Sequence, residues 1–154
     1  LEKWRSTIVV VNKWDLVEKD SYTMDEYTKK IRAALNFVDY VPVIFISAST
    51  GQRVNKVLPL ALQVQEERLD HVGTGSLNRI LMKAQDLHSP TSKTGRILRI
   101  YYGTQVHSDP PTFMLYVNDP QLMHFTYLRF LENQLRMAFP YIGTPIRFVL
   151  KKRS

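Results

Sequence analysis

The sequence contains no cysteine among its 154 residues. Disulfide bridges, thiolate zinc sites and cysteine nucleophiles are therefore excluded together, and the absence fits a reducing compartment. Long apolar runs are also missing, because stretches such as Ile8–Val11 and Val43–Ile46 have only the length of a strand. A membrane-spanning helix needs about 20 apolar residues, so no membrane span is expected.

Glycine is scarce, and none of the six glycines fits the spacing of a G-x-x-x-x-G-K-[ST] loop. In such a loop the backbone amides cradle phosphates and the Ser or Thr hydroxyl holds magnesium. The D-x-x-G pattern occurs only at Asp70–Gly73, after the second predicted helix, with no phosphate-cradling loop before it. We therefore expect no phosphoryl-transfer chemistry, no magnesium site and no catalytic residue within this sequence. The four histidines have no metal-ligand spacing, so no other metal site is expected.

The first residue is Leu1 rather than Met, and a strand-like segment begins only six residues later. No signal-peptide pattern follows Leu1. We therefore expect the chain to be a segment of a longer protein. Its 44% hydrophobic and 23% charged residues are a globular composition, which excludes a disordered tail.

Positive charge is concentrated in the second half of the sequence. Residues 1–70 hold ten basic and ten acidic residues, whereas residues 71–154 hold eleven basic and four acidic ones. The whole net charge of +7 therefore comes from the second half. This asymmetry predicts two modules, of which the second faces a polyanion such as RNA. A basic surface that only aids solubility is the alternative.

Two β-branched apolar runs, Thr7–Asn12 and Val41–Ser47, are typical of strands buried on both faces of a parallel sheet. Two strands are too few for a doubly wound sheet. We therefore expect the remaining strands to come from sequence outside this chain.

Helical spacing of apolar residues predicts one helix over residues 23–35 and a second over residues 54–69. Thr23 and Glu26 form a capping-box pattern at the start of the first, and Asn55 is a candidate cap for the second. The first half is thus predicted to be a strand–helix–strand–helix α/β unit.

Residues 71–76, which include two glycines, are predicted to link this unit to an α+β domain with the order α–β–β–α–β. The expected elements are a helix capped by Ser76, strands at 97–106 and 112–118, a helix over 121–139 capped by Asp119, and a strand at 145–150 followed by a basic tail.

The quartet Asn12-Lys13-Trp14-Asp15 comes directly after the first buried strand, where ligands bind in open α/β sheets. The Asp15 carboxylate can accept hydrogen bonds from N1–H and the exocyclic amino group of guanine, a donor pair that adenine lacks. Asn12 can bond the other purine edge or tie neighbouring loops together. The aliphatic stem of Lys13 can cover a face of the ring.

The second buried strand ends in Ser47-Ala48-Ser49. The backbone N–H of Ala48 is a candidate donor to the guanine carbonyl oxygen, and the Ser47 hydroxyl can hold the first loop. Either motif alone is weak evidence. Both together, at the ends of strands separated by one helix, predict a guanine-recognition site.

These two motifs resemble the guanine-specificity motif (G4) and the following G5 motif of translation-factor-class, Ras-like GTPases. With the second half, the resemblance narrows to the second GTPase domain and C-terminal KH-like domain of the bacterial double-GTPase family called EngA or Der. The residues that support it are Lys93, Gly95, Ile100-Tyr101-Tyr102, Thr104–Val106, Pro110–Phe113, Val117–Pro120, Leu131–Arg136 and Gly143–Arg147.

The resemblance implies a partial Ras-like domain over residues 1–72 and a KH-like domain over residues 73–154. For the family it also implies GTP and GDP binding with magnesium, GTP hydrolysis, and a role in assembly of the large ribosomal subunit. The expected partners are that subunit or its rRNA and the remaining GTPase domains of a longer parent chain. The expected compartment is the cytoplasm or an organelle stroma of bacterial origin.

The second half departs from RNA-binding KH domains, which clamp a nucleic-acid backbone with a G-x-x-G loop, because no G-x-x-G occurs. An interaction domain without base recognition is therefore the favoured interpretation of the KH-like fold. We expect Tyr101 and Tyr102 to pack in a core rather than stack on bases.

Contacts with RNA phosphates are predicted for exposed basic residues of the second half: Lys93, Arg96, Lys151, Lys152 and Arg153. Arginines within regular elements, such as Arg136, are candidate partners for Asp119 or Glu132 instead.

Two apolar stripes run along the helix predicted over 121–139. One, expected to face its own domain, comprises Leu122, Phe125, Leu135 and Ala138. The other comprises Met123, Tyr127 and Phe130, and two interpretations of it stay open: packing in the same core, or docking against the GTPase module. A non-enzymatic basic module that binds the ribosome or RNA, or a protein-interaction domain, is the alternative function.

Overall fold

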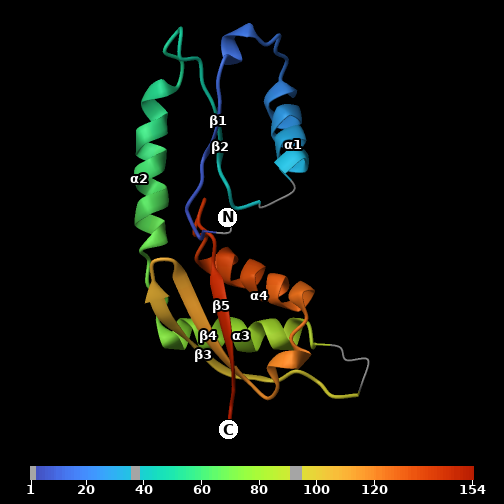
Figure 1. Cartoon of the computed structure of the whole chain (residues 1–154). Helices are drawn as coiled ribbons and strands as arrows, with labels where there is room; N and C mark the ends of the chain where they lie inside the picture. Colours follow the sequence, from blue (N-terminus) through green and yellow to red (C-terminus); the bar gives the residue numbers. More distant parts are fainter. Residues whose placement is uncertain (1–2, 36–38, 91–94) are drawn as a thin grey trace.

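The computed structural model describes residues 3–35, 39–90 and 95–154, and it contains two separate sheets (Figure 1). The first sheet pairs β1 (Val9–Val11) with β2 (Val43–Phe45) in parallel, with Val10 opposite Ile44. Helices α1 (Thr23–Leu35) and α2 (Val57–Arg68) follow the two strands. This is the predicted strand–helix–strand–helix order.

Both helices of the first part begin differently from the prediction. The Thr23 hydroxyl donates to the Asp20 carboxylate at 2.9 Å, and the Glu26 N–H donates to the carbonyl of Tyr22, so the expected capping box does not form. The hydrogen bonds from Tyr22 and Thr23 lower the pKa of Asp20. A 3-10 turn, η2 (Val54–Lys56), precedes α2, so Asn55 lies within that turn and does not cap the helix.

The second part has the predicted order α–β–β–α–β. Its elements are α3 (Thr74–Leu87), β3 (Ile100–Ser108), β4 (Pro111–Val117), the 3-10 turn η3 (Pro120–Leu122), α4 (Phe125–Ala138) and β5 (Arg147–Lys152). The sheet order is β3-β4-β5, with β3 antiparallel and β5 parallel to the central strand β4.

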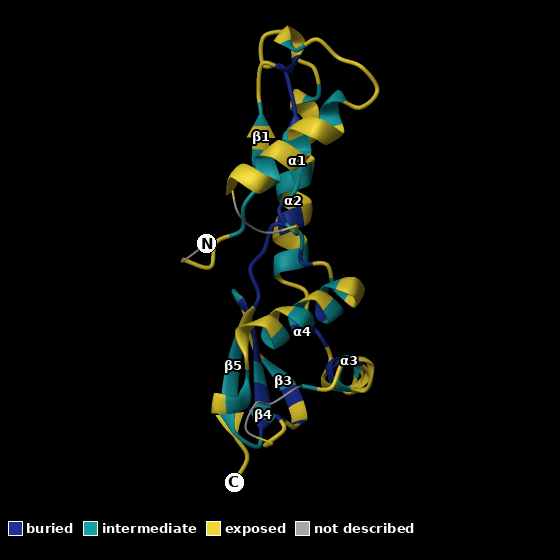
Figure 2. Cartoon of the chain, turned by 90° about the vertical axis from the view of Figure 1, so that its right-hand side faces the viewer, coloured by how far each residue is buried: buried dark blue, intermediate teal, exposed yellow. Residues whose placement is uncertain are grey.

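One face of this sheet packs against α3 and α4, and the opposite face is turned away from both helices (Figure 2). Phe113 and Leu115 of β4 are fully buried against Leu81 of α3 and Leu131 of α4. Gly103 of β3 is required here, because a Cβ atom would lie 2.8 Å from Leu81 and 2.9 Å from Leu115. No helix in the described part of the chain is long and apolar enough to cross a membrane.

The predicted continuous helix over 121–139 is interrupted at Met123 and His124. Asp119 does cap, but it caps only η3, where its carboxylate accepts from Gln121 N–H at 3.1 Å. The backbone is then extended at Met123 and His124, and the His124 ring accepts from Thr126 N–H to begin α4. A second cap therefore starts a second helix.

The prediction for the two stripes of this helix is only partly right, because Leu122 and Leu135 do pack against the domain core. Phe125 is 69% exposed and Ala138 is exposed, so these two residues do not face the domain core. Met123, Tyr127 and Phe130 instead pack against that core. The Tyr127 hydroxyl donates to the carbonyl of His88 at the end of α3, which ties the two helices together within one domain.

Tyr101 and Tyr102 lie outside the core, contrary to the prediction. A register shift between Ile100 and Tyr102 breaks the alternation of β3. As a result Ile100 and Gly103 are buried, while Tyr101 and Tyr102 are 40% and 42% exposed.

The two parts of the chain meet at the loop between α4 and β5. Gly143 bridges both strands of the first sheet near their starts, because its carbonyl accepts from Thr7 N–H at 2.7 Å and its N–H donates to Tyr40 O at 2.6 Å. The Tyr141 hydroxyl donates to Asp70 O at 2.7 Å. The pKa of the Tyr141 hydroxyl is raised to about 12, mainly because this side chain is buried.

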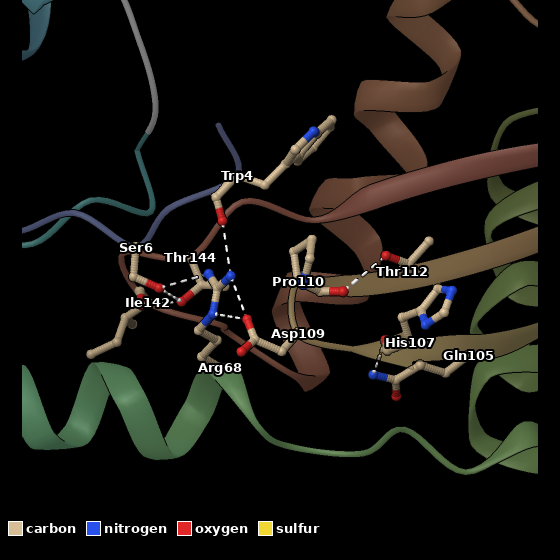
Figure 3. Close-up of polar contacts among 10 residues, drawn as sticks. All are labelled: Trp4, Ser6, Arg68, Gln105, His107, Asp109, Pro110, Thr112, Ile142 and Thr144. Carbon is tan, nitrogen blue, oxygen red and sulfur yellow. Dashed lines mark hydrogen bonds and ion pairs between the residues drawn. The ribbon is translucent and has the colours of Figure 1, made fainter. Parts of the chain in front are cut away.

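A second contact between the parts centres on Arg68 at the end of α2 (Figure 3). Its guanidinium pairs with Asp109 in the β3–β4 turn at 2.6 Å. It also donates to Ser6 Oγ at 3.1 Å and to the Trp4 carbonyl at 2.9 Å. This largely buried cation thus joins α2 to the segment before β1 and to the β3–β4 turn, three segments that are distant in sequence.

Gly143→Ala is expected to destabilise the chain by about 3 kcal/mol, because the new Cβ would lie 2.6 Å from the Thr7 carbonyl and because φ at this residue is +64°. Urea unfolding followed by circular dichroism measures the loss. Gly51→Ala is the matched control, since Gly51 also has positive φ but open space around it. It should cost only about 1 kcal/mol. Equal losses in the two variants would show that the close approach at Gly143 contributes nothing.

Candidate functional site

The predicted base-recognition residues lie together at the carboxyl ends of β1 and β2. Backbone bonds extend the pairing beyond the strands, because Ile46 N–H donates to Val11 O at 2.8 Å and Trp14 N–H donates to Ile46 O at 3.1 Å. The loop 12–15 therefore lies beside the loop 47–49, as the parallel arrangement of the two strands predicts.

The Asn12 side chain joins the two loops. Its Oδ1 atom accepts from the backbone N–H of Lys13 at 2.7 Å and of Ala48 at 3.0 Å. Of the two roles considered for Asn12, the structure thus shows loop tying. The Ala48 N–H that we assigned to a guanine carbonyl is engaged by this bond, so a purine oxygen bound there would replace Asn12 as the acceptor.

The Asp15 carboxylate is held from the second loop. Ser47, whose side chain is fully buried, donates its hydroxyl to Asp15 Oδ1 at 2.7 Å. The Ser47 oxygen also lies 3.2 Å from the Ser49 hydroxyl and accepts from Thr50 N–H at 3.3 Å. Asp15 itself remains exposed. The carboxylate is therefore held through one of its two oxygens and is still accessible to a ligand.

Lys13 is exposed and adopts the left-handed conformation, with φ of 59°. This backbone geometry turns the chain sharply into the 3-10 turn η1 (Trp14–Leu16).

Trp14 is the residue of this site for which the sequence pattern suggested no role. It is only 2% exposed, and its ring contacts Phe45 of β2 and Tyr27 of α1 at centroid distances of 4.5 and 5.3 Å. Burial of this ring fixes the loop between Lys13 and Asp15. The signal available in the sequence was a large aromatic residue inside an otherwise polar quartet.

The arrangement can select a base by hydrogen bonding, but the described residues offer no place for a metal. Within residues 3–35, 39–90 and 95–154, no group of three or more His, Asp or Glu side chains is placed to hold a metal ion.

The predicted basic contacts that the structure describes lie before β3 and at the end of β5. Lys93 lies outside the described residues. Arg96 pairs with Asp119 at 3.3 Å while its side chain stays 68% exposed. Lys151 and Lys152 belong to strand β5 rather than to a tail, and Arg153 continues the pairing through its N–H to Val117 O at 2.9 Å. All three side chains at this end are exposed.

Comparison with known proteins finds relatives that match both halves of the chain. Residues 71–151 match the family described as the KH-domain-like, C-terminal part of EngA bacterial GTPase enzymes. Curated relatives named GTPase Der are 44% identical over 153 residues in Alkaliphilus oremlandii and 49% identical over 153 residues in Caldanaerobacter subterraneus and in Geobacillus sp. strain WCH70. Each match covers 99% of this chain and 35% of the relative, so the chain spans about a third of their length.

Asn12→Ala is expected to speed hydrogen exchange at the Ala48 amide about fivefold, because that N–H loses an acceptor worth about 1 kcal/mol. Exchange followed by NMR measures the rate. Asn55→Ala, in the exposed turn η2, is the control and should leave the Ala48 rate unchanged. An unaltered Ala48 rate in Asn12→Ala would mean that this bond does not hold the loops together.

Proposed function

This chain belongs to the EngA family of bacterial GTPases, and we propose that its residues 1–72 are the base-recognition half of a Ras-like GTP-binding domain. Residues 73–154 are the KH-like domain that follows it. The observation that supports the first assignment is the pair of loops after β1 and β2, which the Asn12–Ala48 and Asp15–Ser47 bonds hold side by side.

In this proposal the Asp15 carboxylate accepts from N1–H and the amino group of guanine, and Ser47 holds that carboxylate in place. The Ala48 N–H donates to the guanine carbonyl, exchanging its present acceptor Asn12. The stem of exposed Lys13 covers the ring. Adenine would leave the Asp15 carboxylate opposite an acceptor, which gives specificity for GTP and GDP.

We propose that GTP is hydrolysed by the whole protein and not by this chain alone. This chain has no phosphate-cradling loop, and its single D-x-x-G pattern, Asp70–Gly73, follows the base-recognition motifs, so by itself it should hydrolyse no GTP. Relatives named GTPase Der are about three times as long as this chain. In a parent of that length, the phosphate-cradling loop, the switch motif and the magnesium site would lie in the additional sequence.

The proposed role of the whole protein is assembly of the large ribosomal subunit, in the cytoplasm or an organelle stroma of bacterial origin. The support is the family membership together with the net charge of +7, all of which lies in residues 71–154. The partners would be that subunit or its rRNA and the other GTPase domains of the parent. A non-enzymatic basic module that binds RNA or protein is the second candidate, favoured by the missing catalytic motifs.

Asp15→Asn in the full-length parent is expected to shift the preference from GTP towards XTP by tenfold or more. Xanthine has a carbonyl where guanine has an amino group, so an amide donor at position 15 restores complementarity. Competition binding with GTP and XTP measures the shift. Asp25→Asn, on the exposed first turn of α1, is the control. An Asp15→Asn protein with an unchanged GTP preference would show that Asp15 does not contact the base.

Neutralising the five predicted RNA contacts (Lys93, Arg96, Lys151, Lys152 and Arg153) to Gln is expected to weaken binding of large-subunit rRNA about tenfold or more at 0.1 M salt or below. The salt dependence should also become shallower, by roughly one unit of slope for each phosphate that the variant no longer neutralises. Filter binding across a salt series measures both quantities.

The control carries five Lys→Gln changes in the first half, at Lys3, Lys19, Lys29, Lys30 and Lys56, which remove the same charge from another surface. Equal reductions in affinity for the two variants would mean that net charge alone, rather than the KH-like domain, attracts the RNA.

A further inference from the structure

The face of the β3-β4-β5 sheet that turns away from α3 and α4 has an unusual composition. In Figure 1 the three strands lie in front of α3, so the viewer looks onto this face. Its side chains at one end are three tyrosines and two cations, which we call the tyrosine face: Tyr101, Tyr102, Tyr116, Lys151 and Arg153.

Two of the tyrosines form a parallel stack across neighbouring strands. The rings of Tyr102 on β3 and Tyr116 on β4 are 4.3 Å apart with an interplanar angle of 17°. Tyr102 is 42% exposed and Tyr116 is half-buried, so both rings retain surface that contacts solvent. Stacked rings on an open sheet supply flat apolar area in a fixed orientation.

Two cations, Lys151 at the end of β5 and Arg153 just after it, lie over tyrosine rings of this face. The ammonium of Lys151 lies 5.9 Å from the Tyr116 ring centre, and the Arg153 guanidinium lies 4.8 Å from that of Tyr101. Further along the same side of β5, Arg147 lies 5.8 Å from the ring of Trp4. Residues 147 to 153, which are β5 and the residue after it, span about 20 Å, so aromatic and positive groups recur along an extended path.

Nothing on the three strands opposes this charge, since β3, β4 and β5 contain no Asp or Glu. Asp109, in the turn between β3 and β4, is paired with Arg68. A surface of rings and cations without carboxylates is complementary to a ligand that combines flat π-systems with a polyanionic backbone.

We propose that the tyrosine face binds a single-stranded segment of RNA, whose phosphates draw Lys151 and Arg153 off the rings while its bases stack on Tyr102, Tyr116 and Tyr101. This rests on the proposed function in that RNA is the partner of the KH-like domain. The mode differs from a G-x-x-G clamp, because it uses the sheet face and reads no base edge. Duplex RNA keeps its bases stacked internally and would meet only the cations.

The test compares labelled RNA of about 12 nucleotides, single-stranded or as a duplex, by fluorescence anisotropy with the whole 154-residue chain. The variant Tyr102→Leu with Tyr116→Leu should bind the single strand about tenfold or more weakly, with the same salt slope and unchanged duplex affinity. The corresponding pair of Tyr→Phe changes should retain binding, because the rings remain. Tyr22→Leu, at a residue 70% exposed in the first part of the chain, is the control.

Circular dichroism and the thermal midpoint of each variant establish that it is folded. A folded Leu variant that binds single-stranded RNA like the wild type, while the variant with five neutralised cations does not, would overturn this inference and leave the proposed RNA partner intact. No binding of either RNA by the wild-type chain would overturn both. A Leu variant that keeps its RNA affinity but no longer binds the remaining domains of the parent, supplied as a separate polypeptide, would overturn the inference by identifying a protein-docking face.

Discussion

The contacts of a single guanidinium, that of Arg136 on α4, determine the shape of the joint between the two parts of the chain. It donates to Glu132 at 2.8 Å and to the carbonyls of Pro140, Tyr141 and Thr144 at 2.8 to 3.0 Å, and its central carbon lies 3.7 Å from the ring centre of Tyr40. Burial lowers the pKa of Arg136, although an arginine remains charged in a folded protein. The carbonyls that accept from it fix the loop 140–144, and that loop places Gly143 against the first sheet.

This joint and the proposed base-recognition loops lie at opposite ends of the same two strands. Gly143 is bonded to Thr7 just before β1 and to Tyr40 just before β2, whereas Asn12 and Ser47 follow the strands directly. Each strand has only three residues. A movement of the KH-like domain that breaks the bonds of Gly143 would therefore act on the base-recognition loops through a very short, directly bonded path.

The features predictable from sequence were those set by local pattern. β-branched runs located β1 and β2, and the two motifs after them located Asn12, Asp15, Ser47 and Ala48, because side chains at parallel strand ends have little freedom in where they lie. The errors came from tertiary context. Asp119 and Pro120 signal a helix start correctly, but no local rule says that the His124 ring will begin another helix. The irregular register at Tyr101 and Tyr102 depends on β4, and the loop geometry around Arg136 depends on Tyr40, which is 96 residues away.

The positions of the two tryptophans give the molecule two intrinsic optical reporters. Trp14 is 2% exposed beneath the base-recognition loop, whereas Trp4 is 37% exposed beside Arg147 at the edge of the KH-like sheet. A buried indole emits at shorter wavelength than a hydrated one, so the two signals are separable in an unlabelled chain. Replacing Trp4 by Phe would leave an emission spectrum that follows the loops after β1 and β2 alone, and replacing Trp14 would leave one that follows the opposite end.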